Sequence, residues 1–199
     1  MILIPRFVDI SVRQTTSRYD GHSYLLLIPT GENVMPNTQK ITPCLWFDSQ
    51  AEEAVEFYIG IFRNSRILNI SRYGEAGREV HGKPAGSVMT IAFELDGQAF
   101  TALNGGPTFK FNEAISFQID CETKEEVDYY WEKLSEGGDE KAQQCGWLKD
   151  KFGASWQIIP SILSKMMSDA DPEKSGRVME AMLRMKKIDV DELARAYAG

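Results

Sequence analysis

The stretch Leu45-Trp46-Phe47-Asp48 decides the fold of this chain, because it recurs as Phe117-Gln118-Ile119-Asp120, an offset of 72 positions (45 to 117). Further matches continue at the same offset without a gap: Glu53 with Glu125, Val55 with Val127, Glu56 with Asp128, and Phe57-Tyr58 with Tyr129-Tyr130. Each copy predicts a short apolar strand, an acidic turn and an amphipathic helix. The chain therefore contains two related modules.

Helix starts are predicted in both copies by capping boxes, in which a hydroxyl accepts a bond from a free N–H and a carboxylate reaches back. The first pair is Ser49 with Glu52, and the second is Thr123 with Glu126. In the first helix the apolar positions follow helical spacing and predict one buried stripe. These positions are Ala51, Ala54, Val55, Tyr58, Ile61 and Phe62.

Strands are predicted after each helix. The first helix precedes strands at Arg66–Tyr73, Ser87–Leu95 and Gln98–Leu103, and the second precedes Gln143–Leu148 and Ser155–Pro160. Asp96-Gly97 is a two-residue hairpin turn, since these residues tolerate a left-handed backbone. The fold class is α+β, with two successive strand-helix-strands modules over 41–107 and 113–160, the second one shorter, that form one domain at 41–160.

Two segments lie outside the repeat. Residues 161–199 predict a C-terminal helical extension, with Asp171 before Pro172 capping one helix and Asp189 with Glu192 capping another. Its apolar positions predict the packed face of a covering helix: Met179, Met182, Leu183 and Met185. Residues 1–40 predict a flexible or loosely structured lead, in which Tyr24–Ile28 could add a strand and whose first 37 residues could be a start-site artefact.

Composition excludes several classes of protein. The 199 residues carry a net charge of −7, and the paired modules hold all of this excess acidity, which disfavours nucleic-acid binding. Apolar runs of about five residues are far too short for a membrane span, and no secretory h-region precedes the modules. The three cysteines Cys44, Cys121 and Cys145 form no CxxC motif, so a reducing, cytoplasmic location is expected.

Several dispersed motifs resemble the vicinal oxygen chelate superfamily, in its PhnB-like branch labelled 3-demethylubiquinone-9 3-methyltransferase-like. The motifs lie at Ile41–Asp48, Ala51–Ala54 with Phe57-Tyr58, Phe100–Pro107, Phe109–Phe117, Cys145–Asp150 and Ser155–Pro160. The resemblance covers about 40–199. It implies paired βαβββ modules that form a curved, cleft-containing mixed sheet, commonly in a homodimer.

The resemblance also implies four positions for a divalent metal, which would stabilise oxyanion charge on a substrate. Carried over, they fall on Thr42, Thr101, Ala114 and Gln157, the last two supported by the internal offset and by aligning Gly97 with Gly153. None is a histidine or carboxylate, the donors that such metals prefer, and a one-residue shift adds only Glu113. His22 and His81 lie far from these strands. No cofactor is therefore predicted, and a metal is disfavoured.

A small-molecule ligand is expected instead, in an aromatic-walled cleft at the module junction. The residues predicted to bind it are Cys44, Trp46, Thr101, Asn104, Phe111, Ser116, Trp147 and Gln157, with Trp156 as a further aromatic candidate. The aromatic residues have core packing as their structural alternative, Cys44 a role as a small buried residue, and the polar residues Asn104, Ser116 and Gln157 local hydrogen bonding. His81 is expected to be an exposed loop residue, with a substrate contact or a general base as its alternative.

Catalysis is left open by the sequence. The alternative function is an enzyme of the glyoxalase/dioxygenase superfamily (a lyase, a dioxygenase or, as the label has it, a methyltransferase) whose chemistry rests on Gln157, Asn104 or Cys44. A nucleotide-binding turn would open a helix after a strand. Asn104-Gly105-Gly106-Pro107 is followed by no helical pattern, so we interpret it as a connection between the modules.

Overall fold

A computed structural model describes residues 12–19, 22–29 and 40–199, and divides the chain into compact units at 1–41 and 42–199. In the first unit, β1 (Val12–Tyr19) pairs with β2 (His22–Pro29) in an antiparallel hairpin. Strand β2 includes the apolar run Tyr24–Ile28, where a strand was one expectation. The rest of the predicted lead, 1–11, 20–21 and 30–39, lies outside the described residues.

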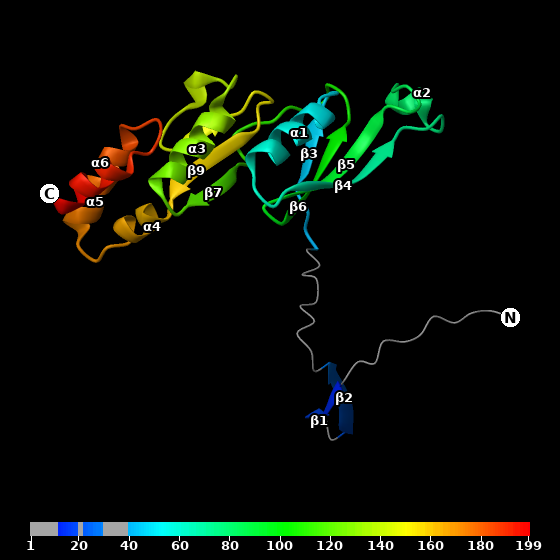
Figure 1. The fold of residues 1–199 in the computed structure, drawn as a ribbon, viewed down its shortest axis with the longest axis horizontal. Coiled ribbons are helices and arrows are strands. Elements are labelled where there is room, and N and C mark those ends of the chain that lie inside the picture. Colours follow the sequence, from blue (N-terminus) through cyan, green and yellow to red (C-terminus); the bar gives the residue numbers. More distant parts are fainter. Residues whose placement is uncertain (1–11, 20–21, 30–39) are drawn as a thin grey trace. The chain divides into compact units, whose positions relative to one another are not determined.

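The first module of the second unit forms a four-stranded sheet in the order β3-β6-β5-β4. Its strands are β3 (Cys44–Phe47), β4 (Arg66–Arg72), β5 (Val88–Leu95) and β6 (Gln98–Asn104). Helix α1 (Ala51–Ile61) packs along this sheet, and its predicted stripe is buried (Figure 1). At the predicted hairpin, Asp96 and Gly97 both adopt positive φ, so the turn is confirmed.

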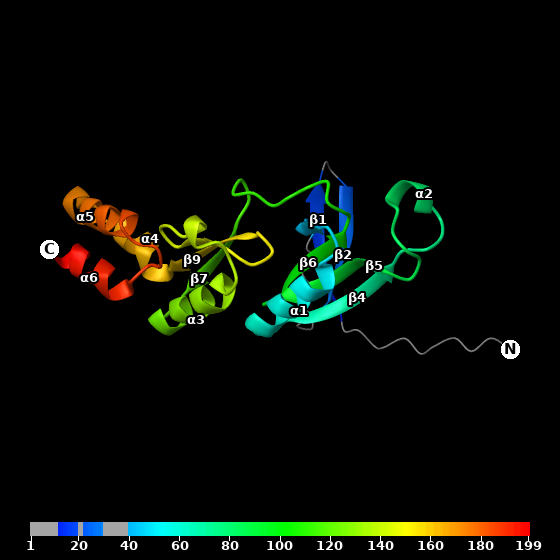
Figure 2. The ribbon, with the colours of Figure 1, turned by 90° about the horizontal axis from the view of Figure 1, so that it is seen from above.

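The second module forms a three-stranded sheet in the order β7-β9-β8, covered by α3 (Lys124–Ser135) (Figure 2). Its strands are β7 (Phe117–Cys121), β8 (Trp147–Lys149) and β9 (Ser155–Pro160). The strand expected over 143–148 is wrong in extent, because β8 begins only at Trp147 and Gln144 makes no more than an isolated bridge to it. The N–H groups of Cys145 and Gly146 then donate to the Met185 and Lys186 carbonyls instead of a sheet partner.

The predicted α+β class with paired modules is therefore confirmed. Within 40–199 the second module has three strands, so it is βαββ and not βαβββ, and the strands form two sheets instead of one curved sheet. A single hydrophobic core nevertheless joins the modules. Phe62, directly after α1, stacks against Tyr130 of α3 and Trp156 of β9, with ring centroids 5.3 and 5.4 Å away. The Tyr129 hydroxyl also donates to the Ile61 carbonyl at 2.9 Å.

The capping predictions hold for α3 but not for α1. Thr123 accepts from the Glu126 N–H at 3.2 Å, while the Glu126 carboxylate accepts from the Glu122 N–H. Helix α1 is instead preceded by Gln50, and its first N–H donates to the Asn104 side chain of β6 at 2.9 Å. A buried amide from a neighbouring strand thus replaces the local cap predicted at Ser49.

The C-terminal extension is helical, as predicted, and has a hydrophobic cluster of its own. It comprises α4 (Ser161–Met167), α5 (Pro172–Leu183) and α6 (Val190–Ala198). Asp171 and Asp189 cap α5 and α6 as expected. Of the four residues predicted to pack, Met185 is buried and Met182 joins the cluster, but Met179 and Leu183 are exposed.

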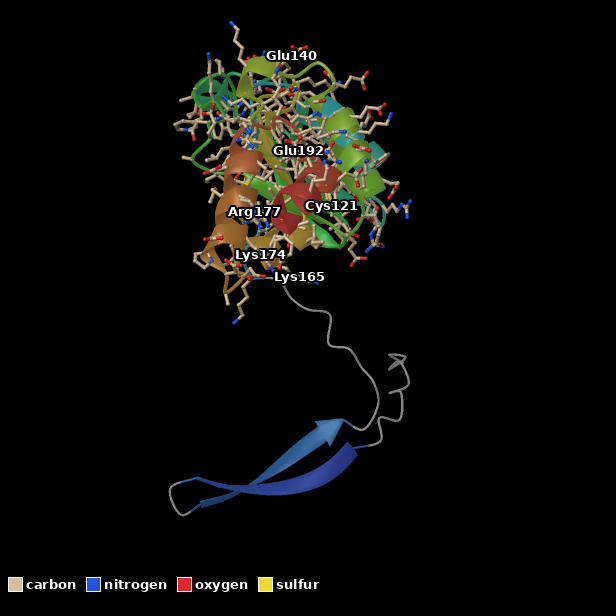
Figure 3. All side chains as sticks on the ribbon, turned by 90° about the vertical axis from the view of Figure 1, so that its left-hand side faces the viewer. Cys121, Glu140, Lys165, Lys174, Arg177 and Glu192 are labelled. Carbon is tan, nitrogen blue, oxygen red and sulfur yellow. The ribbon has the colours of Figure 1, made fainter. Side chains whose placement is uncertain are left out.

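Polar contacts fix this extension. In Figure 3, Arg177 of α5 lies beside α6, and its guanidinium donates to the Ala196 and Tyr197 carbonyls at 2.8 and 3.0 Å. Ion pairs join Lys187 to Asp128 of α3, and Lys124 of α3 to Asp191. No helix in the described part of the chain is long and apolar enough to cross a membrane.

Candidate functional site

Two cavities lie where the 105–116 connection passes between the modules. The larger, of about 480 Å³, is lined from both modules and from the connection. Its lining residues are Pro43, Cys44, Leu45, Trp46, Phe109, Lys110, Phe111, Asn112, Ile115, Phe117, Ala154 and Ser155. The smaller, of about 330 Å³, shares Trp46, Phe109, Lys110 and Phe111 with it and adds Asp48, Gln50, Lys149 and Phe152. The connection is therefore a wall common to both.

Trp46 is held by the glycines that follow β6. A Cβ on Gly105 would lie 2.3 Å from the indole Cζ2 atom, so only glycine permits this contact. The indole N–H donates to the Gly106 carbonyl at 2.7 Å, and Phe109 packs edge-on at 4.9 Å between ring centroids. Asn104-Gly105-Gly106 thus continues into the connection, as predicted, and seats an aromatic wall residue.

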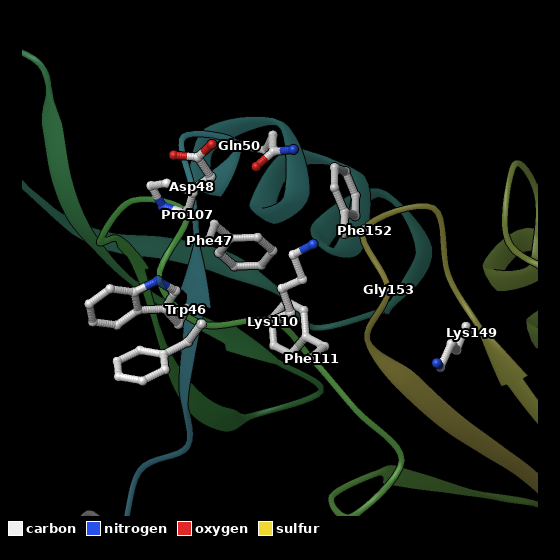
Figure 4. Close-up of a pocket in the computed structure, with 11 residues that line it drawn as sticks. Trp46, Phe47, Asp48, Gln50, Pro107, Lys110, Phe111, Lys149, Phe152 and Gly153 are labelled. Carbon is white, nitrogen blue, oxygen red and sulfur yellow. The ribbon is translucent and has the colours of Figure 1, made fainter.

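Aromatic rings from both modules form the smaller cavity (Figure 4). Phe47 lies between Phe111 and Phe152, with centroid separations of 5.3 and 6.1 Å. Figure 4 shows the Lys110 side chain extending between these rings towards Gln50 and Phe152. The Lys110 ammonium therefore points into the smaller cavity.

The turn that contributes Phe152 is organised by the buried carboxylate of Asp150. One of its oxygens accepts from the Phe152 and Ala154 N–H groups at 2.9 and 3.0 Å. The other accepts from Tyr58 of α1 and the Trp156 indole at 2.7 and 2.8 Å. Burial raises the pKa of the Asp150 carboxyl, and the hydrogen bonds from Trp156 and Tyr58 oppose this shift. The first module thereby fixes a cavity wall of the second.

Polar groups in the larger cavity are few. Ser155 is 3% exposed, and its Oγ is the buried side-chain oxygen without a hydrogen-bond partner within the described residues. Cys44 is exposed, so the alternative of a small buried residue is wrong. Partial burial nevertheless raises the pKa of its thiol, which keeps it protonated and weakly nucleophilic.

Of the predicted ligand-binding residues, the structure brings Cys44, Trp46 and Phe111 together in the larger cavity. Thr101 is half-buried and pairs with Cys44 in the β3–β6 ladder. Asn104 is buried and holds backbone, accepting from Ala51 and donating to the Val88 carbonyl at 3.1 Å.

The other predicted residues lie on the second sheet (Trp147 and Gln157) or directly before its strand β7 (Ser116). Gln157 donates to Ser116 Oγ at 2.8 Å and pairs across the strands with Trp147. Neither cavity is lined by these three residues. Trp156, the remaining aromatic candidate, is core at 2% exposure.

Strand register also corrects one correspondence between the modules. Trp46 pairs with Leu103, and its counterpart Gln118 pairs with Gln157. Leu103, not Thr101, is therefore the structural counterpart of Gln157. By the same register, Thr101 corresponds to Ser155, the serine of the larger cavity.

The four positions implied for a metal do not fit one chemically. They offer two hydroxyls, one methyl group and one carboxamide, where imidazole or carboxylate is needed. No group of three His, Cys, Asp or Glu side chains suited to a metal occurs in 40–199. Glu113 forms an ion pair with Lys149.

His81 is half-buried instead of exposed and supports its own loop. Its ring packs on Tyr73 at 4.5 Å between centroids, and its Nδ1 accepts from the Lys83 N–H at 3.0 Å. The Lys83 ammonium in turn donates to the Asp48 carbonyl at 2.9 Å, beside the smaller cavity.

Sequence reasoning missed Phe109, Lys110, Phe117 and Ser155 as cavity residues. It also missed Asp150, whose carboxylate accepts from the N–H groups of Phe152 and Ala154 in the turn beside the cavities. Phe109 and Phe111 flank Lys110 in a segment without helix or strand. Two aromatic residues so close together in the connection could have indicated a cavity wall. Ser155 carried no signal in sequence, because its distinction is a missing partner.

The paired-module α+β fold is that of the vicinal oxygen chelate class. The chain belongs to the 3-demethylubiquinone-9 3-methyltransferase family, whose model matches residues 39–159. Among curated proteins none matches the chain.

The chain is also similar to solved structures, of which the first below supports this assignment. A PhnB protein from Bacillus cereus, described as a 3-demethylubiquinone-9 3-methyltransferase, is 38% identical over 61% of this chain and 99% of its own, with a TM-score of 0.54. A protein from Staphylococcus aureus is 28% identical over 60% of this chain and 94% of its own, with a TM-score of 0.27. The fosfomycin resistance protein FosX from Listeria monocytogenes is 17% identical, covering 67% and 99% of the two chains, with a TM-score of 0.44.

Proposed function

We propose that this protein binds a small molecule in the larger cavity without the divalent metal of its superfamily. The carrying observation is a cavity of about 480 Å³ walled by four aromatic residues from both modules and their connection. These residues are Trp46, Phe109, Phe111 and Phe117. Ligand sites of drug-sized molecules have this volume range and this apolar, aromatic lining.

Binding is favoured over catalysis by what the candidate catalytic residues do. The Asn104 amide is engaged with backbone, Gln157 is bonded to Ser116, and the raised pKa of Cys44 disfavours its thiolate. A nucleophile needs a base or a lowered pKa to act. The family label names a methyltransferase, but the connection after β6 leads into β7 and opens no helix that could seat a nucleotide.

A homodimer in a reducing, cytoplasmic location completes the proposal. The first sheet carries α1 on one face, while Thr90, Ala92 and Thr101 on the other face stay only half-buried. A second copy would cover such a face, which sedimentation of the full chain tests directly. The free state of Cys44, Cys121 and Cys145 supports a reducing compartment.

Equilibrium dialysis with 2-naphthol, a small uncharged aromatic probe, tests ligand binding. Trp46→Ala removes one wall and should weaken binding at least about tenfold, the scale of a lost aromatic contact. Trp147→Ala is the matched control, because this half-buried tryptophan lines neither cavity. Equal losses in the two variants would place the site elsewhere.

Metal analysis tests the other half of the proposal. After incubation with nickel, zinc or manganese and gel filtration, we expect less than stoichiometric metal. A stoichiometric metal that is lost in Gln157→Ala would contradict the metal-free proposal.

A further inference from the structure

The larger cavity differs from the smaller one in the charge of its lining. Among the described residues that line it, Lys110 alone is charged. The smaller cavity is lined by Asp48, Lys149 and the same Lys110. Figure 4 shows the Lys110 side chain pointing towards Gln50 and Phe152, which line the smaller cavity and not the larger one.

One buried polar group in this wall lacks a partner. Ser155 begins β9 and pairs with Lys149 across the β8–β9 ladder. Its hydroxyl has no hydrogen-bond partner within the described part of the chain. A buried hydroxyl without a partner costs free energy, and it can turn about its own bond to meet an incoming atom.

We infer that the larger cavity selects an uncharged, ring-bearing ligand whose single hydroxyl or carbonyl oxygen hydrogen-bonds to Ser155. A carboxylate or phosphonate would bind less well. This inference rests on the proposed function and names the chemical class of its ligand.

Electrostatics supports the preference for a neutral ligand. Burial raises the pKa of the Cys44 thiol in the same cavity, so the surroundings disfavour a negative charge there. A ligand anion would meet the same desolvation cost, and the one charged residue among the described lining residues, Lys110, points towards Gln50 and Phe152 of the smaller cavity. The net charge of −7 on the whole chain adds long-range repulsion.

Three probes of one shape separate ring, hydroxyl and charge: 2-naphthol, 2-methylnaphthalene and 2-naphthoate. We expect the full chain to bind 2-naphthol about tenfold more tightly than 2-naphthoate in equilibrium dialysis, since the anion loses its hydration. Ser155→Ala should weaken 2-naphthol about fivefold, the scale of one hydrogen bond, and leave 2-methylnaphthalene unchanged.

Ser161→Ala is the matched control. It removes a half-buried hydroxyl that donates to the Cys121 carbonyl outside both cavities, and it should change no probe. The ranking of the probes on the unmodified chain needs no variant, so it holds if Ser155→Ala fails to fold.

The outcomes are distinct. Tighter binding of 2-naphthoate, or equal losses of 2-naphthol and 2-methylnaphthalene in Ser155→Ala, would overturn this inference and leave the proposed function standing. If none of the three probes binds, the proposed function itself fails.

Discussion

The hydroxyl of Tyr58 donates to the buried carboxylate of Asp150 at 2.7 Å, across 92 positions of sequence. Tyr58 lies on α1 of the first module, and Asp150 organises the turn that ends in Ala154 and Ser155 of the second. Asp150 is 2% exposed and has no cation among its four hydrogen-bond partners. The cavity wall therefore depends on a contact between modules.

Tyr58→Phe should destabilise the protein by about 1.5–3 kcal/mol, because a buried charged acceptor loses one of its donors. Tyr129→Phe is the control, since its hydroxyl donates to a neutral carbonyl, that of Ile61, and should cost about 1 kcal/mol. Urea unfolding measures both free energies. Equal losses would argue against a special role for the Asp150 contact.

Asp150→Asn should cost more than Tyr58→Phe. Each carboxylate oxygen of Asp150 accepts from two donors. In the asparagine variant an NH2 group replaces one of these oxygens, and because this group only donates, two of the four donors lose their acceptor. We expect a loss of at least about 2 kcal/mol in the free energy of unfolding. Asp120→Asn alters an exposed carboxylate and should stay within about 0.5 kcal/mol of the unmodified protein.

We expect the difference in stability between the unmodified protein and Asp150→Asn to depend on pH. Burial raises the pKa of Asp150 in the folded state above its ordinary value of 3.8, so the folded state holds this proton more tightly. The stability linked to the proton is fully present below pH 3.8 and is lost as pH rises through the folded pKa. The stability advantage of the unmodified protein over Asp150→Asn should therefore shrink with rising pH, and growth of this difference would contradict the raised pKa.

Gly105→Ala should disrupt the aromatic wall. The added Cβ would lie 2.3 Å from Trp46, so the indole must leave its position and 2-naphthol binding should fall at least about tenfold. Gly60→Ala is the control, because a Cβ added at this position of helix α1 would have no atom within 4 Å. This variant should raise the free energy of unfolding by about 0.5–1 kcal/mol. Unchanged probe affinity in Gly105→Ala would show that Trp46 does not contact the ligand.

Substitutions at the two predicted helix caps should have different effects on stability. Thr123→Ala should lower the free energy of unfolding by about 1 kcal/mol, because its hydroxyl caps α3. Ser49→Ala should change it by less than about 0.5 kcal/mol, since that side chain does not cap α1. A comparable loss of stability in Ser49→Ala would indicate that Ser49 caps α1, as predicted from the sequence.

The α3 cap could be predicted because it is local. Thr123 and Glu126 are three residues apart, and the helix itself brings the hydroxyl to the N–H. The hairpin at Asp96-Gly97 and strand β9 at Ser155–Pro160 were equally accessible, since turn chemistry and alternation act between near neighbours.

The cap of α1 could not be predicted in this way. Asn104 reaches Ala51 only because β6 pairs beside β3. Its amide oxygen therefore accepts a bond from the backbone of α1, although Asn104 was predicted to bind the ligand. Of that set, Cys44, Trp46 and Phe111 do line one cavity, while Ser116 and Gln157 bond to each other. Whether a side chain meets a cavity or a neighbour depends on contacts far apart in sequence.

The sequence alone determined the repeat of strand and helix, the helical extension and the poor fit of Thr42, Thr101, Ala114 and Gln157 to a metal. Residue chemistry and short-range periodicity suffice for these. Tertiary structure alone decided that Asp150 is buried under Tyr58, that Trp46 packs on Gly105 and that Ser155 lacks a partner. The physical reason is that burial and hydrogen-bond satisfaction belong to the packed chain, and its candidate function depends on them.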